Sequence, residues 1–145
     1  MVGGASGSSS SATSQLDAVQ VSGGFGEAPT LTAQWPVSMD QTLSKVLVAG
    51  NGQTVGSDST VQVNYSGTNG RTGKVFDSNF ASGKSSTFGL TQVIAGFQKG
   101  LAGKHAGDRV LIGVTSADGY AAGLPSADIE AGDSLFFVVD IIAVS

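Results

Sequence analysis

Only one stretch of this chain has the apolar spacing of an amphipathic helix, which leaves strands and loops for the rest. Between Thr91 and Gly103, four apolar residues recur at helical spacing and would form a single face: Val93, Ile94, Phe97 and Leu101. Thr91 is placed to cap the first turn, and Gly103 to end the helix. Glycine is frequent, at 22 of 145 residues, and only 12% of the residues are charged. This composition favours a turn-rich β protein over a helical bundle.

Several other segments carry the patterns of strands. Residues 60–65, Thr-Val-Gln-Val-Asn-Tyr, alternate polar and apolar side chains, as expected of a half-buried strand. The runs at 108–114 and 135–144 are apolar and β-branched, which predicts buried strands. Shorter strands are predicted at 43–48 and 74–78, and loops at 81–86 and 116–133. About five strands, one short helix and long loops together predict an α+β fold.

The composition of the chain changes before residue 42. Residues 1–15 are mostly Gly, Ser, Ala and Thr, which predicts a disordered Gly/Ser-rich linker. Residues 16–41 are mixed, with short extended pieces at 20–22 and 30–33. They are predicted to be an N-terminal extension that packs on a domain formed by residues 42–145.

Charge and residue types exclude several classes of function. The formal charge is −4, so no nucleic-acid-binding surface is expected. With no cysteine and one histidine, His105, the chain lacks the ligands of a zinc–thiolate or multi-histidine site, and no metal or cofactor is expected. The acidic residues Asp128, Glu130 and Asp133 are interpreted as a solvated loop. The longest apolar run, 135–144, contains Asp140 and is too short for a transmembrane segment.

From residue 61 onward the chain contains short motifs in a distinctive order. They are Val-Asn-Tyr-Ser-Gly at 63–67, Gly-Lys-Val-Phe-Asp-Ser at 73–78, Phe-Gly-Leu-Thr-Gln-Val-Ile-Ala-Gly-Phe at 88–97, Gly-Asp-Arg-Val at 107–110, Gly-Tyr at 119–120 and Leu-Phe-Phe-Val-Val-Asp-Ile-Ile at 135–142. In order and spacing, residues 42–145 resemble the FKBP-type peptidyl-prolyl cis–trans isomerases. The resemblance implies an antiparallel sheet of about five strands wrapped around one short helix. Residues 28–42 also resemble the lead-in of some bacterial two-domain members, which would make the chain one domain of a secreted protein.

The resemblance further implies an apolar active site between the helix and the sheet. Its expected catalytic residues are Tyr65, Asp77 and Tyr120, with Asp77 hydrogen-bonded to Tyr65 and the Tyr120 hydroxyl donating to the substrate. Its expected substrate-binding residues are Phe76, Val93, Ile94, Phe97, Ile129 and Phe137. The backbone N–H of Ile94 would hold a substrate carbonyl. Periodicity alone favours the simpler interpretation that the apolar members are core residues, because most buried aromatic side chains only pack.

The chain departs from the pattern of the family at two positions of the pocket and in its long loop, which is shortened at residues 124–126 and has Glu130-Ala131 in place of a frequent Pro-Pro pair. Phe97 stands where most members have Trp, and Ser86 stands where an aromatic wall is common. Two functions therefore stay open. The first is a peptidyl-prolyl cis–trans isomerase, or rotamase, that acts on proline-containing polypeptides as a protein-folding catalyst. The second is a catalytically weak FKBP-fold module that binds a protein partner or acts as a chaperone.

The resemblance and the composition also carry expectations about ligands and location. Macrolides such as tacrolimus or rapamycin are expected to bind the pocket, with an affinity weakened by Phe97. The protein is expected to be a monomer. Low charge and a Gly/Ser-rich start favour an extracytoplasmic location, in the secreted fraction or the cell envelope, over a cytoplasmic one.

Overall fold

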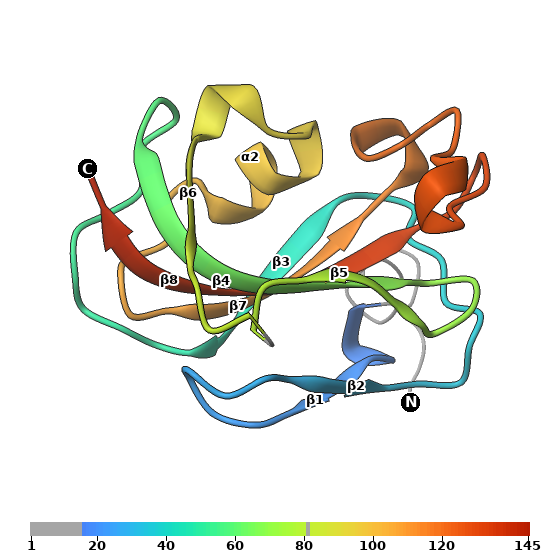
Figure 1. Cartoon of the computed structure of the whole chain (residues 1–145), viewed down its shortest axis with the longest axis horizontal. Coiled ribbons are helices and arrows are strands. Elements are labelled where there is room, and N and C mark those ends of the chain that lie inside the picture. Colours follow the sequence, from blue (N-terminus) through green and yellow to red (C-terminus); the bar gives the residue numbers. More distant parts are fainter. Residues whose placement is uncertain (1–15, 81) are drawn as a thin grey trace, which may run out of the picture.

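An antiparallel β-sheet that curves around one short helix forms the centre of this chain (Figure 1), as seen in a computed structural model that describes residues 16–80 and 82–145. Within these residues the main sheet has six strands, in the order β3, β7, β8, β4 and β5, with β6 also paired to β4. The predicted α+β class is therefore confirmed, with one strand more than expected. The disorder predicted for residues 1–15 lies outside the described residues.

The strands of this sheet pair only in antiparallel fashion. Their bounds are β3 (Leu43–Val48), β4 (Thr60–Asn69), β5 (Val75–Ser78), β6 (Ser86–Gly89), β7 (Arg109–Val114) and β8 (Leu135–Val144). Strand β4 pairs with β8 along one side, and with β5 and β6 in turn along the other. No sequence pattern predicts β6, because four residues are too few to establish a period.

Helix α2 (Ala95–Leu101) follows a 3₁₀ turn, η2 (Leu90–Gln92). The prediction that Thr91 caps the helix is wrong, because Thr91 lies inside η2. The backbone is still extended at Val93 and Ile94, with ψ values of 170° and 152°, so the helix begins only at Ala95. Gly103, with φ at +81°, lies just beyond the helix, where the sequence predicts its end.

Two glycines allow α2 to lie close against β7. A Cβ at Gly96 would come within 2.5 Å of Val114, and one at Gly100 within 2.6 Å of Ile112. Because neither glycine carries a side chain, the helix backbone packs closely against the sheet. The helix and the sheet then enclose an apolar cluster that includes Phe97 and Leu101.

Strand β8 is buried on both faces over residues 135–141, which explains its nearly continuous apolar sequence. On the helix side, the apolar cluster contains four of its residues: Leu135, Phe137, Val139 and Ile141. On the opposite side, Phe136 and Val138 pack with Leu16, Val19 and Met39 from the start of the described chain. The sheet thus separates two apolar layers, of which only the first borders the helix.

The N-terminal segment lies on the face of the sheet opposite α2 (Figure 1). It contains a hairpin of β1 (Gln20–Ser22) and β2 (Thr30–Thr32). The hairpin turn is bound by a fully buried ion pair, in which Arg109 Nε lies 2.7 Å from Asp140 Oδ1. Three backbone groups of the turn complete the hydrogen bonding of this pair: the carbonyls of Gly23 and Glu27, and the N–H of Gly26.

No helix in the described part of the chain is both long enough and apolar enough to cross a membrane.

Candidate active site

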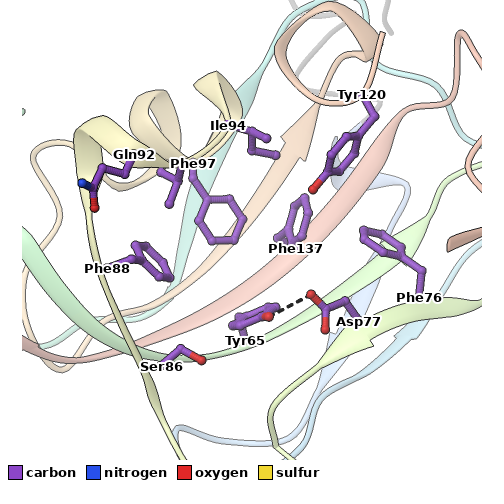
Figure 2. A pocket seen from close by; sticks show the side chains of 11 residues that line it. Tyr65, Phe76, Asp77, Ser86, Phe88, Gln92, Ile94, Phe97, Tyr120 and Phe137 are labelled. Atoms are coloured by element: carbon purple, nitrogen blue, oxygen red, sulfur yellow. Dashed lines mark hydrogen bonds between the residues drawn. The ribbon is translucent and has the colours of Figure 1, made fainter. Parts of the chain in front are cut away.

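A pocket of about 340 Å³ lies between the N-terminal end of α2 and the face of the sheet that curves around it (Figure 2). Its lining comes from four strands, helix α2 and the residues just before it, and the loop after β7. The residues that line it are Tyr65, Phe76, Asp77, Ser86, Phe88, Gln92, Val93, Ile94, Phe97, Tyr120 and Phe137. Every site residue expected from the resemblance, except Ile129, is among them.

Aromatic rings form the floor of the pocket through edge-to-face contacts. The ring centroids of Phe97 and Phe137 are 4.7 Å apart and perpendicular, and Phe76 meets Phe137 at 5.6 Å. Tyr65 packs edge-on against Phe97 at 6.2 Å. Gly67 of β4 lies beneath two of the rings, since a Cβ there would come within 2.7 Å of Phe137 and 2.8 Å of Phe76. The result is a rigid apolar surface on which a small ring can pack.

The rim of the pocket carries a hydrogen bond between β4 and β5. The Tyr65 hydroxyl donates to Asp77 Oδ2 at 2.8 Å, as expected from the resemblance (Figure 2). Burial, the hydrogen bond to Asp77 and the charge of that carboxylate raise the pKa of Tyr65 to about 12. Tyr65 is therefore a protonated donor at neutral pH. Asp77 is exposed, and it is the one formally charged residue in the lining.

Backbone groups at the start of α2 form a second polar feature of the pocket wall. The Ile94 carbonyl accepts hydrogen bonds from the N–H groups of Phe97 and Gln98. The Gln98 side chain also donates to the Val93 carbonyl at 3.0 Å, which fixes the approach to the helix. Among the described residues, none accepts a hydrogen bond from the Ile94 N–H. This N–H is free to donate to a bound carbonyl group.

Tyr120 reaches the pocket from the loop between β7 and β8, and its hydroxyl points into the cavity (Figure 2). The loop contains two 3₁₀ turns, η3 (Ser116–Asp118) and η4 (Pro125–Ala127). Its far end is bound through Asp133, which accepts hydrogen bonds from Asn69 Nδ2 at 3.0 Å and Arg71 Nε at 3.1 Å. The prediction of a solvated acidic loop is wrong for Asp133, which is only 7% exposed.

Ile129 is the expected site residue that the pocket wall does not include. Its N–H and carbonyl both bond to Leu124 in an isolated bridge, and its side chain is buried in the cluster beneath the loop. The structure therefore corrects the expectation that Ile129 lines the pocket. Its position supports the loop from below.

Three lining residues, Ser86, Phe88 and Gln92, are missing from the expected set of site residues. Phe88 lies two residues after Ser86 on β6, so both side chains face the same side of the strand. Its ring centroid is 5.8 Å from that of Phe97. Recognising β6 as a strand would have identified Phe88 as the aromatic wall on this side. Nothing in the sequence marks Gln92.

No group of three or more His, Asp or Glu side chains that could hold a metal ion occurs in residues 16–80 and 82–145. The lining offers aromatic surface, one carboxylate, two phenol hydroxyls and a free N–H. Such a set can bind a planar amide beside a small ring.

Comparison with known proteins assigns this sequence and fold to one family. A profile of the FKBP-type peptidyl-prolyl cis-trans isomerases matches residues 51–142, more than half of the chain. A crystal structure of a peptidyl-prolyl cis-trans isomerase from Pseudomonas syringae is 30% identical in sequence and superposes with a TM-score of 0.64, covering 72% of this chain and 75% of the other. FkpA from Escherichia coli is 31% identical with a TM-score of 0.66, covering 72% and 48% of the two chains. The architecture is therefore FKBP-like.

Sequence relatives agree with this assignment. A probable FK506-binding protein of Corynebacterium glutamicum is 32% identical over 74% of this chain and 90% of its own length. A probable FKBP-type peptidyl-prolyl cis-trans isomerase of Haemophilus influenzae is 35% identical over 70% of this chain, which spans only 42% of that relative. The chain belongs to the FKBP-type peptidyl-prolyl cis-trans isomerase family, and it is an isomerase of this type.

Proposed function

We propose that the aromatic pocket is the active site, and that it accelerates rotation about Xaa-Pro bonds in polypeptide substrates. The observation that carries this proposal is the pocket of about 340 Å³, in which aromatic rings meet edge to face around a space with a single carboxylate at its rim. Phe76, Phe97 and Phe137 would enclose the proline ring, with Val93 and Ile94 forming the wall on the helix side.

Rotation about a peptide bond must break amide resonance, which costs about 18–20 kcal/mol. The twisted transition state has a less polar carbonyl than the planar amide, so its transfer from water into an apolar pocket costs less free energy. An apolar pocket therefore binds the twisted state better than the planar one. An acceleration of about 10⁴ requires the twisted state to be bound more tightly than the planar state by about 5.5 kcal/mol. No proton has to move, which is consistent with a lining that contains no histidine or lysine.

Polar groups at the edges of the pocket would hold the substrate in place. The free N–H of Ile94 would donate to one substrate carbonyl, and the Tyr120 hydroxyl to another; the presence of both residues in the lining supports this. Asp77 would lie beside the rotating amide, with its orientation fixed by the hydrogen bond from Tyr65. In this arrangement Tyr65, Asp77 and Tyr120 are the catalytic residues. Ile129 would act only as a support for the loop.

Further parts of the proposal concern ligands and context. Macrolides such as tacrolimus or rapamycin would bind the same pocket, less tightly than where tryptophan forms the floor. Residues 42–145 would form the isomerase domain, with residues 16–41 as an extension packed on it, in a monomer. An extracytoplasmic location is proposed, and one relative at 34% identity is named an outer membrane protein.

Titration of labelled protein with the peptide Ala-Leu-Pro-Phe, followed by amide NMR shifts, tests the site. We expect the largest shifts at Ile94, Tyr120 and Asp77, and we expect rapamycin to reverse them by competition. Peptide shifts confined to residues 16–41 or to the opposite face of the sheet would refute this assignment.

A further inference from the structure

The loop that carries Tyr120 is bound at its start by a group of polar side chains outside the pocket lining. We infer that Asp118, held by Lys99 and Thr42, is a positioning residue that sets the place of Tyr120 over the pocket. This inference rests on the proposed function of Tyr120. It goes beyond the family assignment, because neither Asp118 nor its two partners line the pocket.

One carboxylate oxygen of Asp118 joins three elements of the fold. Asp118 Oδ2 accepts a hydrogen bond from Lys99 Nζ of α2 at 2.8 Å and another from Thr42 Oγ1 at 2.6 Å, just before β3. The same Thr42 hydroxyl accepts from the N–H of Thr115 at 3.2 Å. The N–H of Asp118 in turn bonds to the Thr115 carbonyl at 3.1 Å. The start of the loop is thereby tied to the helix and to the sheet edge at one point.

Tyr120 follows this point by two residues. Asp118 ends η3, and the N–H of Gly119 bonds back to the Ser116 carbonyl at 3.1 Å, so the backbone from Thr115 to Gly119 is fixed. Beyond Tyr120, the next backbone bond is internal to the loop, from the Gly123 N–H to the Tyr120 carbonyl. The interactions of the Asp118 carboxylate therefore determine the position of the backbone from which the Tyr120 side chain projects.

Lys99 gives this contact a direct relation to the pocket. It lies on α2, two residues after Phe97, which forms the floor. The ion pair between Lys99 and Asp118 thus joins the element that carries the floor to the loop that carries Tyr120. Asp118 is 17% exposed and Lys99 is 59% exposed. Replacing the exposed lysine removes the link while leaving the core of the protein intact.

The test compares single variants with the same variants in a background that lacks the tyrosine side chain. Lys99→Met and Asp118→Asn are measured for kcat and KM on a prolyl tetrapeptide, alone and combined with Tyr120→Ala. Each single variant should lower kcat by about threefold to tenfold, the scale of one hydrogen bond to the substrate, with KM little changed. In the Tyr120→Ala background, the same changes should have no further effect.

Two controls separate positioning from general stability. Lys99→Arg keeps the cation and should restore most of the activity. Lys45→Met removes an ion pair of similar length, 2.7 Å to Asp17, that lies away from the pocket, and it should leave kcat unchanged. Thermal unfolding of every variant verifies that the assays are made on folded protein.

The outcomes discriminate between the inference and its premise. A parent protein without isomerase activity would refute the proposed function and the inference with it. An active parent with full activity in Lys99→Met would refute the inference alone. If Lys99→Met or Asp118→Asn lowers kcat by the same factor in the Tyr120→Ala background as in the parent, the inference is also refuted, because the effect would then not pass through Tyr120.

Discussion

Replacing Gly67 by alanine puts a methyl group under the floor of the pocket. The new Cβ would lie 2.7 Å from Phe137 Cε1 and 2.8 Å from Phe76 Cζ. Carbon atoms in contact are normally about 3.5–4.0 Å apart, so the rings must move by about 1 Å. Phe137 is only 4% exposed and has little room, whereas Phe76 is half-buried and can swing into the cavity. We therefore expect the change to narrow the pocket.

The expected effect on activity is larger than the effect on stability. Overpacking costs about 1–3 kcal/mol, and removing a glycine from a strand returns about 0.5–1 kcal/mol. A net loss of about 1 kcal/mol lowers Tm by about 3 °C in a chain of this size. A displacement of about 1 Å in the floor should reduce kcat/KM by about 10-fold to 100-fold.

A matched glycine on the opposite face of the same sheet is the control. A Cβ at Gly113 would come within 2.9 Å of the flexible end of Met39, away from the pocket. Gly113→Ala should keep full activity on the tetrapeptide, with a similar small change in Tm. Full activity in Gly67→Ala, or an equal loss in Gly113→Ala, would refute the claim that ring positions set the rate.

Four further predictions concern titratable and charged groups. Asp77→Asn should lower the pKa of Tyr65 from about 12 toward its ordinary value, because part of the elevation comes from that carboxylate; an unchanged ultraviolet titration of the phenolate would contradict this. Since the pKa of Tyr65 is raised on folding, its contribution to stability should be complete below pH 10 and decline as the pH rises through 12. Burial alone would raise the pKa of Asp133, but hydrogen bonds from the Glu130 N–H, Asn69 and Arg71 hold that pKa below its usual range. The free energy of unfolding should therefore fall as the pH drops below 3.8. Urea unfolding should show a smaller fall for Asp133→Asn. Arg109→Met should cost about 3–5 kcal/mol in urea unfolding, because it leaves the Asp140 carboxylate buried and unpaired, and a cost below 1 kcal/mol would refute this reading of the pair.

Much of the fold could be predicted from the sequence because the long strands have clear patterns. The apolar runs at 108–114 and 135–144 correspond to β7 and β8, whose two-sided burial requires such runs. The short elements were harder. Strand β6 has too few residues to show a period, and the helix start was misplaced because Val93 and Ile94 fit a helical face while adopting an extended backbone.

The site was predictable only in part, for physical reasons that particular residues illustrate. Tyr65 and Asp77 lie on neighbouring strands, and their hydrogen bond was expected from the resemblance to the family and not from any pattern of the residues themselves. The burial of Asp133 cannot be predicted from the residues around it, because its partners Asn69 and Arg71 are more than sixty residues away in the chain. Local charge density gives no sign of such a contact. Only the packing of the loop onto the β4–β5 turn reveals that this carboxylate is buried.

The most direct test of the active-site assignment is cis–trans exchange of Ala-Leu-Pro-Phe, measured by two-dimensional NMR exchange spectroscopy. The parent protein should accelerate exchange, and Asp77→Val should depress it. Asp58→Val, a change at an exposed carboxylate outside the pocket lining, should exchange the peptide like the parent. If the folded parent leaves exchange at its uncatalysed rate, or if Asp77→Val is as active as Asp58→Val, the account of this pocket is contradicted.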